Sequence, residues 1–329
     1  MTRTPRHGLR RPQKHAAPRR PETAPRVSSR FAAKPADTIP HVAAGILELQ
    51  YRLILDSRRR FLDHTDPDAL HDLRVAINRF RQALRLFRPL LKKTSGPALD
   101  DALAAFRRKM GSLRDLEVWI AFLKIRVLAR RQIRRPWRLY LAFQDACIRA
   151  ARAEAVRRLR SAACERLLAR IRRFLRRELP ALSTPPDAAR FNAFAATRLR
   201  KACRRLSKRR PQRLLHDPAA LHDLRKRCKH VRYWAEFSAP ALPPSVGRLA
   251  ALMRHITGTL GDLHDGDVFL TAPRFAANPA PRTVTAAIRN RRTRLHRRLI
   301  RLWKSVKPLL KTDPLPRRAC STRGRSPCG

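Results

Sequence analysis

The chain of 329 residues is poor in glycine, aromatic residues and acids. Only ten glycines occur, and alanine, leucine and arginine are abundant, which favours helix along nearly the whole chain. No apolar stretch approaches the roughly 18 residues of a membrane span, and the N-terminus lacks the apolar region of a secretory signal. We therefore expect a soluble, cytoplasmic, all-α protein.

The six cysteines form no C-x-x-C pair. Four of them lie inside helical patterns, which favours reduced thiols over a disulfide framework: Cys147, Cys164, Cys203 and Cys228. The sequence also has no Gly-rich phosphate loop, no G-x-S-x-G motif and no pair of catalytic carboxylates. We expect a protein that is not an enzyme and that needs no cofactor.

The chain has 24 acidic residues and 76 Lys and Arg residues, and its formal net charge is +52. Residues 41–311 hold +41 of this charge, so most of it lies in the part that folds. Repulsion on this scale opposes a compact state, and a polyanionic partner would relieve it. Arginine supplies 63 of the cations. Its planar fork matches phosphate oxygens, although a genome of high GC content would also raise the share of arginine.

One phrase of nine residues occurs twice, as DPDALHDLR from Asp66 and as DPAALHDLR from Asp217. Asp followed by Pro ahead of a periodic apolar run indicates a helix start, so we expect each Asp-Pro pair to open a helix. A second pair of segments, GSLRDLEV from Gly111 and GDLHDGDV from Gly261, also matches. Glycine at this place fits a helix C-cap in the left-handed conformation. The repeats indicate two copies of one helical unit.

The expected organisation follows from these repeats and from proline-rich turns. Long helices are expected at about 41–62, 67–91, 137–179, 188–208, 218–237 and 282–310. The predicted units are a disordered basic tail at 1–40, a first bundle at 41–182, a second bundle at 187–311 and a disordered tail at 312–329. The first 40 residues also resemble a transit peptide in composition.

Each duplicated helix carries an apolar stripe beside a polar one. The apolar stripes are Leu73, Ile77, Phe80, Leu84, Phe87 and Leu91 in the first copy, and Leu224, Cys228, Val231 and Ala235 in the second. The polar stripes are His71, Arg74, Asn78, Arg81 and Arg85, and then His222, Arg225, Lys229 and Arg232. Arginine and protonated histidine on one face donate hydrogen bonds to phosphate. The alternative for any single helix is a solvated face.

The dipeptide His-Asp, at His71, His222 and His264, also suggests a metal-dependent phosphohydrolase. However, each histidine shares its helix face with Arg or Lys, which would repel a cation. The twenty aromatic residues mostly occupy apolar positions, which argues against a stacking platform for single-stranded nucleic acid. We therefore predict neither a metal site nor base stacking.

These motifs resemble those of the CHAD domain, the conserved histidine α-helical domain, over about residues 40–310. Both halves match, through HDLRVAINRFRQAL with GSLRDLEV and through HDLRKRCKHVRYWAE with LGDLHDGDV. Asn78 and Met110 depart from the usual basic residue and the usual leucine. The resemblance implies two helical bundles, related by a pseudo-twofold axis, around a basic channel or groove that binds inorganic polyphosphate. It indicates a stand-alone member of the family.

Carried over by position, the resemblance implies a set of polyphosphate ligands. They are His71, Arg74, Arg81, Arg85, His222, Arg225, Lys229 and Arg232, with Arg107, Arg108 and Arg114 as weaker candidates. The expected function is non-enzymatic polyphosphate binding, with association to storage granules. The alternatives are a nucleic-acid or nucleoid-associated protein that uses the same charge, and a granule scaffold. Because Asn78 weakens the first stripe and Glu236 closes the second, we expect an asymmetric binding surface.

Overall fold

A computed structural model describes residues 31–91, 94–127, 135–181, 190–271 and 282–311, and their regular structure is entirely helical. The first half contains α1 (Ile39–Leu62), α2 (Ala69–Leu86), α3 (Gly96–Lys109), α4 (Gly111–Val127), α5 (Arg135–Arg160) and α6 (Ala162–Arg173). A π-helical turn, Phe174–Glu178, extends α6. The second half contains α7 (Phe191–Ser207), α8 (Pro218–Ser238), α9 (Pro244–Thr271) and α11 (Arg282–Lys311), with short 3-10 turns at Pro211–Leu214 and Ala239–Ala241. The all-α prediction is confirmed.

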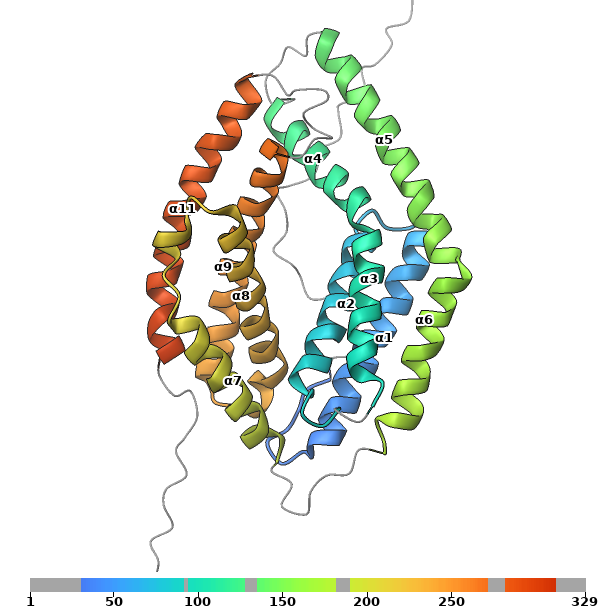
Figure 1. The fold of residues 1–329 in the computed structure, drawn as a ribbon, viewed down its shortest axis with the longest axis vertical. Helices are drawn as coiled ribbons and strands as arrows, with labels where there is room; N and C mark the ends of the chain where they lie inside the picture. The colour runs from blue at the N-terminus through green and yellow to red at the C-terminus, as the bar shows by residue number, and fades with distance from the viewer. Residues whose placement is uncertain (1–30, 92–93, 128–134, 182–189, 272–281, 312–329) are drawn as a thin grey trace, which may run out of the picture.

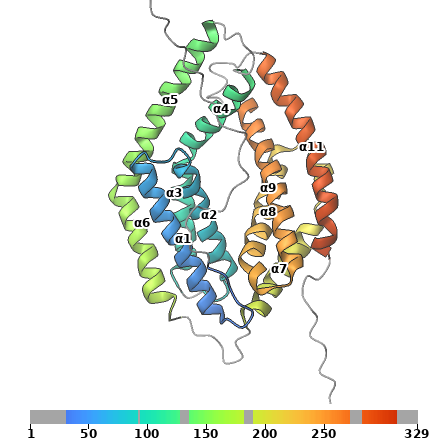
Figure 2. The same cartoon turned by 180° about the vertical axis from the view of Figure 1, so that it is seen from behind.

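The two halves lie side by side (Figure 1), with α1 to α6 in one and α7, α8, α9 and α11 in the other. Seen from behind, α1 lies along α2 (Figure 2), and these two helices are in extensive contact. The halves touch where α2 meets α8, where α4 meets α9 and where α1 meets α7. The predicted bundle boundary at 183–187, residues 1–30 and residues 312–329 lie outside the described residues.

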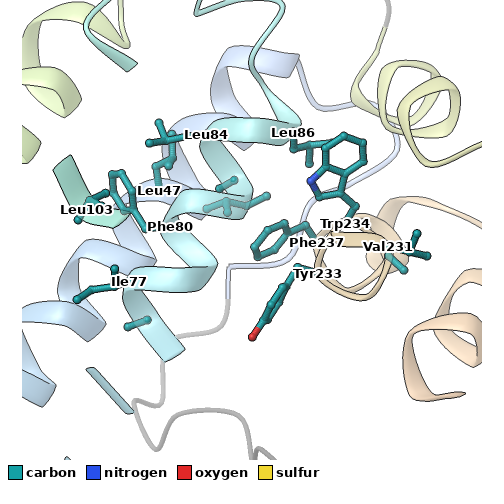
Figure 3. Close-up of a cluster of buried hydrophobic side chains, with 14 of the residues drawn as sticks. Leu47, Ile77, Phe80, Leu84, Leu86, Leu103, Val231, Tyr233, Trp234 and Phe237 are labelled. Atoms are coloured by element: carbon teal, nitrogen blue, oxygen red, sulfur yellow. The ribbon is translucent and has the colours of Figure 1, made fainter. Parts of the chain in front are cut away.

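Both predicted apolar stripes are buried, as expected. Every member of the two stripes is at most 3% exposed. One continuous hydrophobic cluster includes side chains of both halves. Figure 3 shows part of it, with Ile77, Phe80 and Leu84 on α2, and Trp234 and Phe237 on α8. Burying the apolar face of each duplicated helix therefore also joins the two halves.

Polar and aromatic contacts fix the two halves against each other. The indole Nε1 of Trp234 donates a hydrogen bond of 3.1 Å to the backbone oxygen of Gln82, and Nδ1 of His230 lies 3.0 Å from the Gln82 side-chain oxygen. Farther along the interface, the rings of Trp119 on α4 and Phe269 on α9 are 4.6 Å apart. Because these contacts lie on different helix pairs, they restrict rotation of one half against the other.

The two Asp-Pro pairs behave differently. Asp217 is the N-cap of α8, and its side chain accepts a hydrogen bond of 2.9 Å from the backbone N–H of Ala220. This start is confirmed. In the first copy the prediction was wrong, because α2 begins at Ala69 with Asp68 as N-cap. Asp66 instead accepts from the N–H of Asp68 at 2.8 Å and pairs with Arg60 of α1.

The single helix expected at 137–179 is also wrong, because it is divided at Ser161. This residue has an extended backbone, with φ −71° and ψ 151°. Its hydroxyl accepts a hydrogen bond of 3.3 Å from the N–H of Cys164, and donates one of 2.8 Å to the carbonyl of Arg158. Ser161 therefore separates α5 from α6. Serine is common at helix ends because its hydroxyl competes with the helical backbone for hydrogen bonds.

Residues 31–38, which the composition assigned to the N-terminal tail, pack on the folded part. Ala33 is 3% exposed, and the carbonyl of Asp37 accepts a hydrogen bond of 2.9 Å from the N–H of Phe191 at the start of α7. Thr38 caps α1. Within the described residues, no helix is long and apolar enough to cross a membrane.

Candidate functional site

Arg74, the last residue of the first repeated phrase, points from α2 to the end of α3. Its Nη1 donates hydrogen bonds to the carbonyls of Met110, at 2.8 Å, and Arg107, at 3.3 Å. The last carbonyls of a helix have no partner within the helix, so these bonds satisfy them. Burial, and then repulsion by Arg107, lower the pKa of Arg74 to about 10. Arg74 therefore keeps its charge at neutral pH in a site that penalises it.

Arg225, the equivalent residue of the second phrase, lies against Gly261. A Cβ on Gly261 would be 3.3 Å from Nη2 of Arg225, and a Cβ on Gly111 would be 3.9 Å from Nη1 of Arg74. The predicted left-handed caps were wrong, because neither glycine has a positive φ. Gly111 begins α4, and α9 runs straight through Gly261. Glycine instead leaves room for the guanidinium of the repeated phrase.

Arg107 of the first half interacts electrostatically with an arginine of each half. It lies in the last turn of α3, and burial lowers its pKa, with further lowering by Arg81 and by Arg225 of the other half. We name Arg74, Arg107 and Arg225 the arginine cluster. Within the described residues none of the three forms an ion pair with a carboxylate, and the buried Nε atoms of Arg107 and Arg225 lack a hydrogen-bond partner. The cluster therefore has no direct ion pair, and the nearby carboxylates of Asp115 and Glu117 only partly offset the effect of burial on Arg74.

Two histidines adjoin the arginine cluster. The rings of His222 on α8 and His264 on α9 lie 4.5 Å apart. Burial, followed by His264 and nearby cations, lowers the pKa of His222 to about 4. Burial and Arg225 also lower the pKa of His264, against the opposite effect of Asp265 and Asp115. Both imidazoles are consequently neutral at pH 7, and an anion bound beside them would favour their protonation.

The arginines farther along the polar stripes are paired with carboxylates. Arg81 and Arg85 both bind the carboxylate of Asp100 on α3, at 2.6 and 2.9 Å. Arg232, whose side chain is 4% exposed, binds Glu236 at 2.9 Å and Thr257 at 3.2 Å. The pairs with Asp100 join α2 to α3, the bond to Thr257 joins α8 to α9, and together these contacts leave little of Arg81 or Arg232 open to a ligand.

Glu236 is the acid that closes the second stripe. It accepts from Arg232 and also from Arg79 of the first half, at 2.5 Å, and from Arg254 of α9, at 3.1 Å. Burial alone would raise the pKa of Glu236, but Arg79, Arg232 and Arg254 lower it. The two copies thus differ electrostatically at this position, since Arg85 acts as a cation on Asp100 and Glu236 as an anion shared by three arginines.

The other predicted residues are distributed around the site. Arg108 is exposed, His71 and Lys229 are partly buried, and Arg114 binds Glu117 at 3.2 Å. His264 was not among the predicted ligands, although it belongs to a repeated His-Asp dipeptide, and only its ring contact with His222 reveals it. Among the described residues, no group of three or more His, Cys, Asp or Glu side chains could hold a metal ion.

The sequence was compared with known families, and a model of the CHAD domain matches residues 45–274, more than half of the chain. The chain belongs to the CHAD domain family. The match spans α1 to α9, so that α11 of this CHAD protein lies beyond it.

A solved CHAD structure has the same fold. The crystal structure of the CHAD domain from the plant Ricinus communis superposes with a TM-score of 0.64, covering 87% of this chain and 96% of that chain at 23% identity. No curated protein matches the sequence. The CHAD fold is thus established for this chain by family and by structure.

Proposed function

We propose that this CHAD protein binds inorganic polyphosphate, without catalysis, at the arginine cluster. One observation carries the proposal: Arg74, Arg107 and Arg225 converge from both halves, and none of the three forms a direct ion pair with a carboxylate of the described residues. Grouping partly buried cations in this way costs free energy, and an anion that accepts their hydrogen bonds would offset that cost. Polyphosphate binding is also the function that the family resemblance implies.

The chemistry of the cluster fits a chain of phosphates. Arginine presents up to five N–H donors in a fixed fork. The hydrogen bonds of Arg74 within the protein use only Nη1. Phosphates that follow one another closely along a chain would accept from several such forks, whereas an isolated anion would satisfy one or two. We place the first contacts on the arginine cluster and His222, and assign Arg81 and Arg232 to positioning the helices.

The alternative is binding of nucleic acid by net charge alone, which the charge of +52 favours. A competition experiment separates the two. The protein is first bound to fluorescent polyphosphate. Unlabelled long-chain polyphosphate or a duplex of about 30 base pairs is then added as competitor at physiological salt. The proposal expects polyphosphate to compete at least about tenfold better per phosphate. Equal competition per phosphate would remove the specific site.

The proposed setting is the cytoplasm, where binding to polyphosphate would bring the protein to polyphosphate-containing granules. Fluorescence microscopy of a tagged protein checks this setting. The tagged wild type should co-localise with stained polyphosphate, and a variant that lacks the cluster arginines should be diffuse. If both forms co-localise equally, granule association depends on another part of the chain.

A further inference from the structure

The outer face of α11 is a second basic surface, separate from the arginine cluster. No acid occurs in α11, and none occurs in α7, which packs beside it. The inner face of α11 buries Leu299, Trp303 and Val306. At about 100° per residue, the opposite face carries four exposed cations within an arc of about 80°: Arg294, Arg297, Arg301 and Lys304.

Ion pairing within the protein does not account for the cations on the outer face of α11. On α11, Arg291 pairs with Asp262 and Arg292 with Asp267, and both acids lie on α9. Within the described residues, the four outer cations have no carboxylate partner. The outer helices of the first half differ, because Glu154 binds Arg157 of α5 and Glu165 of α6 binds Arg58. The lack of acids is therefore a property of this face and does not extend to every outer helix.

We propose that the outer face of α11 binds the phosphate backbone of double-stranded nucleic acid, without reading base sequence. From Arg294 to Lys304 the helix rises about 15 Å. This length is comparable to the major-groove width of about 12 Å, so the row can reach phosphates on both strands. Such contacts supply affinity that is independent of sequence and falls with salt.

Two other polyanions fit this face less well. A helix that lies on a membrane inserts large apolar residues, but the exposed large apolar side chains among the described residues are Leu55, Phe143 and Leu270, none of them on α11. Single strands stack on exposed aromatic rings, and the one tryptophan of α11, Trp303, is 2% exposed. Of these three partners, duplex phosphate is the one that needs no apolar or aromatic contact.

The test compares two variants that each remove four exposed arginine or lysine charges. The first is Arg294→Ala, Arg297→Ala, Arg301→Ala and Lys304→Ala. The matched control, in the first half, is Arg166→Ala, Arg170→Ala, Arg173→Ala and Arg177→Ala, whose side chains are exposed at similar helical spacing. Duplex binding is followed by fluorescence anisotropy at several NaCl concentrations.

The α11 variant should bind duplex at least tenfold more weakly, and its slope of log Kd against log salt should fall by up to about 3.6, at roughly 0.9 for each of the four lost phosphate contacts. The control should change affinity less than threefold. Equal losses in the two variants would overturn the proposal, as would a loss confined to anionic lipid vesicles. The α11 variant should also keep its polyphosphate affinity, so the proposed function and this surface stand or fall separately.

Discussion

Gly261→Ala tests whether glycine at this position leaves room for the guanidinium of Arg225. The new Cβ would lie 3.3 Å from Nη2 of Arg225, closer than the roughly 3.5–4.0 Å of favourable contacts, so the guanidinium must retreat by a few tenths of an ångström. A flexible side chain can do this cheaply. Alanine is more favourable than glycine inside a helix by about 0.5–1 kcal/mol. We therefore expect the free energy of unfolding to rise, and polyphosphate affinity to fall about fivefold, for a loss of about 1 kcal/mol in one aligned contact.

Gly111→Ala is the matched control, since its Cβ would meet Arg74 at an ordinary distance of 3.9 Å. It should leave polyphosphate affinity unchanged. Thermal unfolding and titration of both variants measure the two effects, and the stabilisation of Gly261→Ala corresponds to a Tm increase of about 1–4 °C. A Tm decrease for Gly261→Ala would refute the reasoning, because a left-handed glycine loses stability when it becomes alanine.

Three further predictions concern buried charge. Glu236→Gln should lower the free energy of unfolding by about 3 kcal/mol in urea titrations, because three arginines lose their shared carboxylate; a change under 1 kcal/mol would contradict this. Burial lowers the pKa of His230 to about 4, so stability should be full above pH 6.5 and decline by up to about 3 kcal/mol as pH falls to 4. His230→Asn should flatten that decline, and an unchanged pH profile would exclude His230 as its cause. Finally, polyphosphate should raise the lowered pKa values of His222 and His264, so binding should take up protons at pH 5–6, measurable by calorimetry in buffers of different ionisation enthalpy; no buffer dependence would place the ligand elsewhere.

The fold was largely predictable because its signals are local. Periodic apolar residues located the buried faces of α2 and α8, and the Asp217-Pro218 pair located a helix start. The start at Asp66 failed because a tertiary contact competed: Arg60 on α1 binds Asp66, whose side chain forms a turn instead of a cap. The break at Ser161 depends on one hydroxyl that bonds in both directions.

The candidate site was less predictable, because the role of each arginine depends on contacts with residues far away in the sequence. Arg81 and Arg74 lie on one stripe and look alike in the sequence. The fold brings Asp100 of α3 to Arg81, but brings helix-end carbonyls and Arg107 to Arg74. Helical spacing identifies a shared face, but it does not tell which cations on that face meet an acid. The role of Gly261 was equally hidden, since it depends on Arg225 from another helix.

The central claim is that converging arginines without direct ion pairs bind polyphosphate, and one titration tests it most directly. Polyphosphate affinity is measured by calorimetry at physiological salt for Arg107→Ala with Arg225→Ala, and for Arg172→Ala with Arg173→Ala, two exposed residues of α6. Both variants remove two charges. We predict a loss of at least about 30-fold, or about 2 kcal/mol, for the first and less than threefold for the second. Equal losses in the two variants would contradict the account.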